Sequence, residues 1–148
     1  MTTEKLKIGL ASDHAGYELK QKLITYIKSE MGLAITDYGT DNKDSVDYPD
    51  FAKKLLKDIV PNNIDFGILI CGSGVGMSIC ANRNKFARAA LCYNKELAKL
   101  AREHNNANIL VLGARFVSLQ NAIKIVKAFL TAKFQGGRHL TRLQKYYD

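Results

Sequence analysis

The sequence predicts an α/β protein in which a parallel β-sheet carries helices on both faces. Short apolar runs alternate five times with segments of helical periodicity, which is the pattern of consecutive β-α-β units. The chain has 148 residues, and this length fits a single domain covering residues 1–148. Hydrophobic residues make up 47% of it, which is enough for a sizeable core.

Five apolar runs have the length of strands. They cover residues 6–11, 33–39, 64–70, 87–93 and 108–114. The commonest order for five doubly wound strands is 2-1-3-4-5, so we expect this Rossmann-like order, with the winding reversing between strands 1 and 3. In such sheets, ligands bind in the crevice at the carboxyl ends of those two strands.

Apolar residues at helical spacing separate the strands and follow the last one. Gly32 supplies a stop signal for the first helix, and Pro49 suits the first turn of the second. The expected helices cover residues 15–31, 49–60, 74–85, 94–104 and 118–133, with a short terminal helix at 137–147.

Composition narrows the classes of function. The formal net charge is +8, but the lysines are scattered and no aromatic stacking motif accompanies them, so nucleic acid is not an expected partner. No apolar run approaches the ~20 residues of a membrane span, and the start does not read as a signal peptide. The 3 cysteines form no CxxC pair, which argues against a disulfide framework or a zinc site. We therefore expect a cytoplasmic protein.

Polar and reactive side chains follow the strands whose ends form the expected crevice. Asp13 and His14 follow the first strand, Cys71 follows the third, and Arg115 follows the fifth. Because the carboxyl ends of parallel strands share one edge of the sheet, these side chains are expected around one pocket. Asp13 also has a structural alternative as a turn residue.

The segment CGSGVG at residues 71–76 begins a predicted helix. Its glycine spacing does not match a dinucleotide fingerprint, a P-loop or a nucleophile elbow. The backbone N–H groups of such a loop can still bind a phosphate or a developing oxyanion. Position alone leaves Cys71 either as a thiolate base or nucleophile, or as a small apolar filler. Cys80 and Cys92, inside a helix and a strand, are expected to be structural.

Further candidates lie in the second half of the chain. His104 ends a predicted helix and precedes Asn105. Arg138 and Arg142 are four residues apart, so in a helical tail they share a face and can grip a phosphate together. The structural alternatives are a favourable helix-end charge for His104 and a solvated basic face for the arginines.

Five sequence blocks carry a resemblance to a known family. In order, they are DHAGYELK, SVDYPD, ILICGSGVGMSICANR, REHNNANILVLGAR and GGRHLTR. With them the chain resembles the ribose-5-phosphate isomerase B family, whose relatives include galactose-6-phosphate isomerase subunits. The resemblance covers essentially the whole chain. It implies a metal-independent isomerase without a cofactor that interconverts ribose 5-phosphate and ribulose 5-phosphate through an enediolate, in the non-oxidative pentose phosphate pathway.

Two alternatives to this function remain open. The substrate can be a six-carbon sugar phosphate, allose 6-phosphate or galactose 6-phosphate, because pocket volume is not readable from the sequence. The protein can also be a non-catalytic sugar-phosphate sensor that uses the same crevice. A sensor would need the phosphate-binding arginines but neither Cys71 nor His104, and both are present.

The resemblance also implies a role for each candidate residue. Cys71 matches the base that moves a proton between C1 and C2, and Ser73 matches a hydroxyl that relays protons between the sugar oxygens. His104 matches the acid that opens the furanose ring, with Asp13 as a polar partner at the sugar. The anion hole for the enediolate matches the amides of Gly72, Ser73, Gly74, Val75 and Gly76. The other substrate contacts match His14, Tyr48, Asn105, Arg115, Arg138 and Arg142.

The family's site is built at a dimer interface, where the segment of His104 and Asn105 reaches toward another subunit's cysteine loop. Two such dimers can form a tetramer. The resemblance therefore implies a homodimer or a homotetramer with shared active sites and a sugar phosphate as the small-molecule partner.

Overall fold

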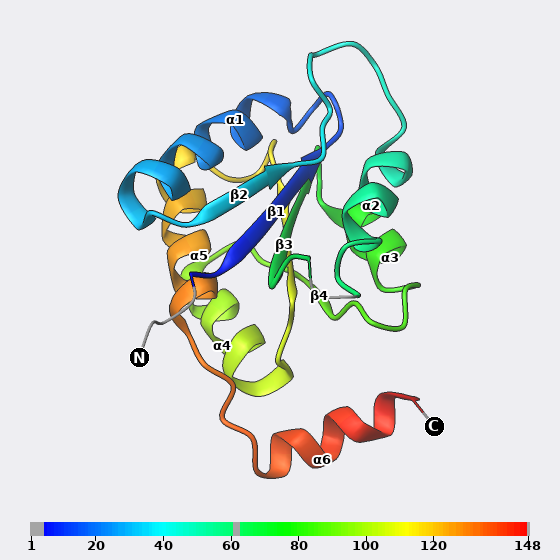
Figure 1. The fold of residues 1–148 in the computed structure, drawn as a ribbon, viewed down its shortest axis with the longest axis vertical. Helices are drawn as coiled ribbons and strands as arrows, with labels where there is room; N and C mark the ends of the chain where they lie inside the picture. Colours follow the sequence, from blue (N-terminus) through cyan, green and yellow to red (C-terminus); the bar gives the residue numbers. More distant parts are fainter. Residues whose placement is uncertain (1–4, 61–62, 148) are drawn as a thin grey trace.

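The computed structural model of the chain describes residues 5–60 and 63–147 (Figure 1). Five parallel strands form one sheet in the order β2-β1-β3-β5-β4. They are β1 (Lys7–Ser12), β2 (Ala34–Asp37), β3 (Phe66–Cys71), β4 (Ala89–Leu91) and β5 (Ile109–Gly113). The predicted α/β class is confirmed, and every strand overlaps its predicted run.

Helices occur where the sequence predicts them, with ends shifted by a few residues. α1 (Tyr17–Tyr26) continues into the π-helical segment η1 (Ile27–Met31), and Gly32 follows with a φ of 64°. Pro49 lies in the first turn of α2 (Tyr48–Leu56), as predicted. The remaining helices are α3 (Val75–Ala81), α4 (Lys95–Asn105), α5 (Leu119–Thr131), α6 (Arg138–Gln144) and the 3-10 turn η2 (Lys145–Tyr147).

The predicted order 2-1-3-4-5 is wrong for the last two strands. β5 pairs with β3, and β4 lies at the edge of the sheet beside β5. All five residues of β5 are buried, whereas β4 has three residues and each is half-buried. A strand with a neighbour on both sides and helices on both faces must be apolar throughout, while a short, half-buried strand suits an edge.

The observed order decides which face of the sheet each helix covers. The connections β1 to β2 and β4 to β5 step across the sheet in one direction, and the connections β2 to β3 and β3 to β4 step in the other. Because β-α-β crossovers are right-handed, opposite steps put their helices on opposite faces. α1 and α4 therefore share one face with α5, and α2 and α3 cover the other (Figure 1).

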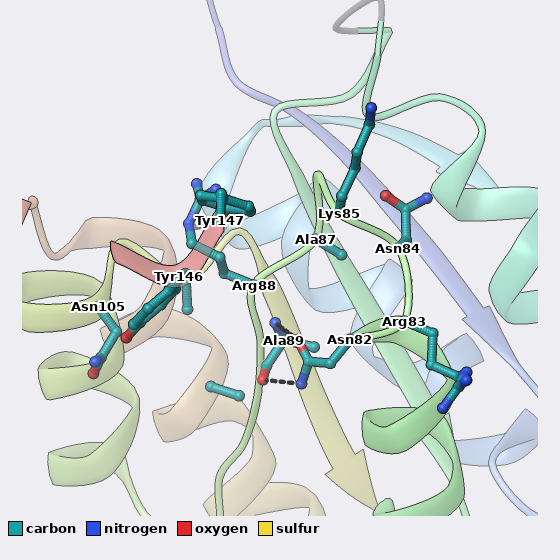
Figure 2. A pocket seen from close by; sticks show the side chains of 12 residues that line it. Asn82, Arg83, Asn84, Lys85, Ala87, Arg88, Ala89, Asn105, Tyr146 and Tyr147 are labelled. Atoms are coloured by element: carbon teal, nitrogen blue, oxygen red, sulfur yellow. Dashed lines mark hydrogen bonds between the residues drawn. The ribbon is translucent and has the colours of Figure 1, made fainter. Parts of the chain in front are cut away.

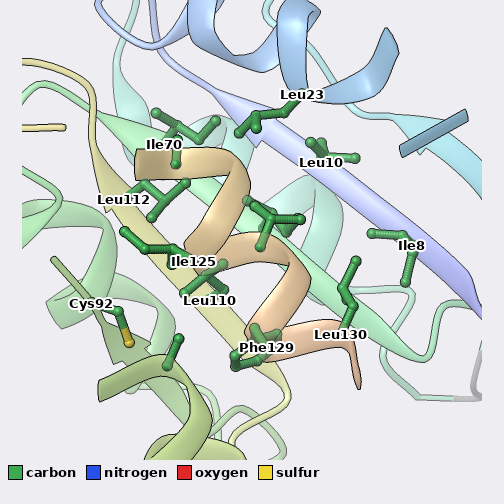
Figure 3. Close-up of a cluster of buried hydrophobic side chains, with 14 of the residues drawn as sticks. Ile8, Leu10, Leu23, Ile70, Cys92, Leu110, Leu112, Ile125, Phe129 and Leu130 are labelled. Atoms are coloured by element: carbon green, nitrogen blue, oxygen red, sulfur yellow. The ribbon is translucent and has the colours of Figure 1, made fainter. Parts of the chain in front are cut away.

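Each face has its own hydrophobic core. Figure 3 shows the larger core, in which aliphatic side chains of β1, β3 and β5 pack against α1 and α5. Cys92 is fully buried in this core, and burial raises the pKa of its thiol to about 12. Cys92 is therefore a structural thiol, as predicted. Cys80 is half-buried and packs against the smaller core under α2 and α3.

The pairing of β3 with β5 presses the chain after β3 against the end of β5. Cys71 lies opposite Gly113 in the ladder, and the Ala114 N–H donates a 2.8 Å bond to the Cys71 carbonyl. A Cβ atom on Gly113 would lie 2.4 Å from the carbonyl oxygen of Ser73. The contact is with backbone, so it leaves no room for a side chain at position 113.

We expect Gly113→Ala to lower the free energy of unfolding by about 1–3 kcal/mol, the usual cost of an extra methyl group in a well-packed site. Urea denaturation followed by circular dichroism measures this loss. Ala114→Ser, one residue further along where the chain is half-buried, is the control and should cost less. Equal stability of Gly113→Ala and the wild type would mean that the loop after β3 shifts freely.

Candidate active site

Cys71 is the last residue of β3, and its side chain is only 5% exposed. The backbone N–H of Gly74 donates a hydrogen bond to its Sγ atom at 3.2 Å. Gly74 has a φ of 81°, a left-handed conformation that favours glycine, and it precedes the first residue of α3. The structure thus joins a thiol to a loop of backbone amides at a helix start, as the sequence predicts.

Ser73 is tied to its surroundings through both its side chain and its backbone. Its Oγ accepts a 3.2 Å bond from the Val75 N–H, and its carbonyl accepts a 3.2 Å bond from the Tyr93 hydroxyl. The Tyr93 carbonyl in turn accepts a 3.0 Å bond from the Asn121 side chain. Tyr93 is a loop-supporting residue that the sequence analysis did not identify. Its position at the carboxyl end of a predicted strand is the signal that points to it.

Asp13 and His14 form a turn after β1. The Asp13 carboxylate is buried, and its Oδ1 accepts a 3.1 Å bond from the Gly16 N–H, which confirms the turn role. The Asp13 N–H donates a 3.2 Å bond to the carbonyl of Ile70, which joins the turn to β3. The Nδ1 atom of His14 accepts a 3.2 Å bond from the Val46 N–H, which joins the ring to the segment before α2.

Tyr48 and Arg115 pack on two glycines of the loop. A Cβ atom on Gly76 would lie 2.5 Å from Cζ of the Tyr48 ring. A Cβ atom on Gly72 would lie 3.1 Å from an Nη atom of Arg115. Ten predicted site residues thus gather at the carboxyl ends of the strands. This cysteine-side group comprises Asp13, His14, Tyr48, Cys71, Gly72, Ser73, Gly74, Val75, Gly76 and Arg115.

The other predicted site residues lie at the opposite end of the strands, where the strands begin. α4 runs antiparallel to the strands, so its last residues lie near the start of β5 and far from the end of β3. α6 packs against this end of α4, and Figure 1 shows it below the sheet. His104 stacks on His139 of α6, with ring centroids 4.3 Å apart and planes 11° apart. His104, Asn105, Arg138, His139 and Arg142 form the histidine-side group.

Positive charge concentrates in the histidine-side group. Burial lowers the pKa of the His139 imidazole, and the stacked His104 and both arginines of α6 lower it further. A lowered pKa keeps His139 neutral at neutral pH, so the fixed positive charges of this group are the guanidinium groups of Arg138 and Arg142.

Arg102 fixes the end of α4 that carries His104 and Asn105. Its buried guanidinium donates from Nη1 to the Asn106 side chain at 2.9 Å and to the Ala107 carbonyl at 2.7 Å. The same guanidinium lies 4.5 Å from the centroid of the Phe66 ring. Asn106 follows α4 with a φ of 47°. These bonds fix the C-terminal end of α4, and with it the positions of His104 and Asn105.

A cavity of about 550 Å³ opens beside Asn105. Figure 2 shows Tyr146, Tyr147 and Arg88 on one side of it and the segment 82–85 on the other. Among the described residues that line the cavity there are three cationic side chains and no acidic one. The cavity therefore extends the positive charge of the histidine-side group.

Within residues 5–60 and 63–147, no three His, Cys, Asp or Glu side chains gather to hold a metal ion. The same part of the chain contains no helix that is long and apolar enough to cross a membrane. The chemical groups that the two site groups offer are a thiol, two hydroxyls, a carboxylate, imidazoles, guanidinium groups, a side-chain amide and backbone amides.

Known proteins resemble this chain over nearly its full length. The model of the Ribose/Galactose Isomerase family matches residues 8–146. Ribose-5-phosphate isomerase B of Escherichia coli (strain K12) is 40% identical over 138 residues, which are 93% of this chain and 92% of the relative.

Solved structures agree with this match. The structure of a ribose 5-phosphate isomerase from Thermotoga maritima is 51% identical, covers 96% of this chain and 97% of its own, and has a TM-score of 0.93. Ribose-5-phosphate isomerase B from Mycoplasma genitalium with bound ribulose-5-phosphate is 43% identical, covers 95% and 93%, and has a TM-score of 0.89. The chain therefore belongs to the ribose/galactose isomerase family.

Proposed function

We propose that this chain interconverts ribose 5-phosphate and ribulose 5-phosphate. The observation that carries the proposal is the Cys71 thiol, held by the Gly74 N–H inside a loop of backbone amides at the carboxyl edge of the sheet. Relatives named ribose-5-phosphate isomerase B, one of them with ribulose-5-phosphate bound, support the same activity. We further propose that the protein acts in the cytoplasm, in the non-oxidative pentose phosphate pathway.

In the proposed reaction the Cys71 thiolate removes the proton from C2 of the open-chain aldose. The electron pair forms the C1–C2 double bond of an enediolate, whose negative charge lies on the oxygen of C1. Cys71 then returns the proton to C1, while Ser73 relays a proton from the oxygen of C2 to the oxygen of C1. The sum is an aldose-to-ketose conversion without net gain or loss of atoms.

We infer that the amides of residues 72–76 stabilise the enediolate. They belong to the loop between β3 and α3 and to the first turn of α3, so their N–H groups lie near the thiol at the positive end of a helix. A pre-organised N–H donor aimed at a developing oxyanion is typically worth about 3–4 kcal/mol. The loop therefore supplies the help that a weakly acidic sugar C–H needs.

In the proposed mechanism, ring opening and phosphate binding use the histidine-side group. Within one chain this group lies at the opposite end of the strands from Cys71. We therefore include in the proposal a homodimer or homotetramer in which this group meets the cysteine-side group of a second copy. Apolar side chains exposed on α3 and α4, such as Ile79 at 62% and Leu97 at 43%, support such a contact. His104 then acts as the ring-opening acid, and Arg138 and Arg142 bind the phosphate.

Conversion of ribose 5-phosphate by the wild type in the presence of EDTA tests the proposed activity. Cys71→Ala should lower the rate by about 10²–10⁴-fold, the contribution typical of a general base, and Cys80→Ala should not. Unchanged activity of Cys71→Ala would place the base elsewhere. Conversion of allose 6-phosphate or galactose 6-phosphate, but not of ribose 5-phosphate, would replace the substrate with a six-carbon sugar phosphate.

Mixing two impaired variants tests the shared site. Cys71→Ala and His104→Asn should each be nearly inactive alone. After joint unfolding and refolding they should recover about a quarter of the wild-type activity, because half of the dimers are mixed and one site in each has both groups intact. Mixed dimers that form but stay inactive would show that each site is built within one chain.

A further inference from the structure

Lys20 of α1 is fully buried, which is rare for a lysine. Its Nζ atom donates to both carboxylate oxygens of Asp37 at the end of β2, at 2.7 and 2.9 Å. The Tyr17 ring lies 5.4 Å from the same nitrogen. A buried ammonium group needs its partner, so this ion pair is a fixed connection between α1 and β2.

Hydrogen bonds link Asp37 in turn to the end of β1. Its Oδ1 atom also accepts a 2.9 Å bond from the Gly39 N–H. The Gly39 carbonyl accepts a 2.7 Å bond from the Ser12 N–H, and the Ser12 carbonyl accepts a 2.9 Å bond from the Thr40 N–H. Ser12 directly precedes the turn that carries Asp13.

Lys20 is joined to the same turn through its own helix. Its backbone N–H donates a 2.9 Å bond to the Gly16 carbonyl, and the Gly16 N–H donates to the Asp13 carboxylate at 3.1 Å. The ion pair therefore closes a ring of bonds. The ring runs from the turn through α1 to Lys20, across to Asp37, and back through residues 39–40 to β1.

We propose that Lys20 and Asp37 are positioning residues that hold Asp13 and His14 for sugar binding. This inference rests on the proposed function, which gives the turn its substrate. An apolar side chain at position 20 would fill the same space without the cost of burying an ammonium group, but it would leave the Asp37 carboxylate, which accepts the Gly39 N–H, without its fixed partner. The Cys71 sulfur is held by a different bond, from the Gly74 N–H, so we expect loss of the ion pair to displace the turn and to leave the thiol largely in place.

Steady-state kinetics of Lys20→Met test the proposal, with Lys20→Arg as the conservative variant and Lys22→Met, an exposed lysine on the same helix, as the control. A misplaced binding group typically costs between about tenfold and 10²-fold, so kcat/KM of Lys20→Met should fall within this range. Lys20→Arg should recover most of the loss, and Lys22→Met should match the wild type.

Two further measurements do not depend on turnover. The chain has 3 histidines, and the NMR signals of their imidazoles can be compared in each variant. In Lys20→Met the His14 signal should move while those of His104 and His139 stay, and iodoacetamide should alkylate Cys71 at the wild-type rate. If the wild type does not isomerise ribose 5-phosphate, the proposed function fails, and these signals still decide whether the ion pair positions the turn.

A Lys20→Met protein with a lower melting temperature but unchanged kcat, KM and His14 signal would overturn the proposal, because the ion pair would then only stabilise the fold. If Lys20→Met does not fold, Asp37→Asn takes its place, since it keeps the shape and an oxygen for Gly39 but removes the charge. A smaller fall in kcat/KM with a shifted His14 signal supports the proposal, and wild-type values for both contradict it.

Discussion

The cysteine-side group depends on the contact between the end of β5 and the loop at residues 72–74, called here the Cys71 loop. The carbonyl of Ser73 lies where a side chain at position 113 would be, and the Ala114 N–H holds the carbonyl of Cys71. With the backbone fixed at these points, the Gly74 N–H meets the sulfur. The order of the strands therefore affects the geometry of the site. A strand beside β3 that lacked a glycine at the position of Gly113 would displace the loop.

The two site groups differ in chemistry as well as in place. The cysteine-side group offers a thiol, a carboxylate and backbone amides, which suit proton transfer and an enediolate, together with the side chains of His14, Tyr48, Ser73 and Arg115. The histidine-side group has the cations Arg138 and Arg142 and extends into a cavity lined by further cations, which suits a phosphate. In the proposed mechanism the two groups act together, so both have to face one substrate.

Most of the fold could be predicted because strand ends and helix ends carry local signals such as Gly32, Pro49 and the Cys71 loop. The order of β4 and β5 could not, since both runs are apolar and the difference between them is how much of each strand becomes buried. Asp13 and Cys71 were predicted because polar residues directly after buried strands are conspicuous. Lys20 was not, although it shares a helix face with Leu23, Ile24 and Ile27, because isolated lysines usually lie at the surface.

A site divided between two copies separates two tasks that many enzymes combine in one pocket. The chemistry depends on the loop after β3, whose geometry is set inside each chain by β5. In the proposed assembly, the distance from that loop to Arg138 and Arg142 depends on how the copies pack. Under the proposed assembly, the length of the accepted sugar phosphate is therefore set by the contact surfaces of α3, α4 and α6. Changes at these surfaces can separate five-carbon from six-carbon substrates without altering Cys71, Ser73 or the amides between them.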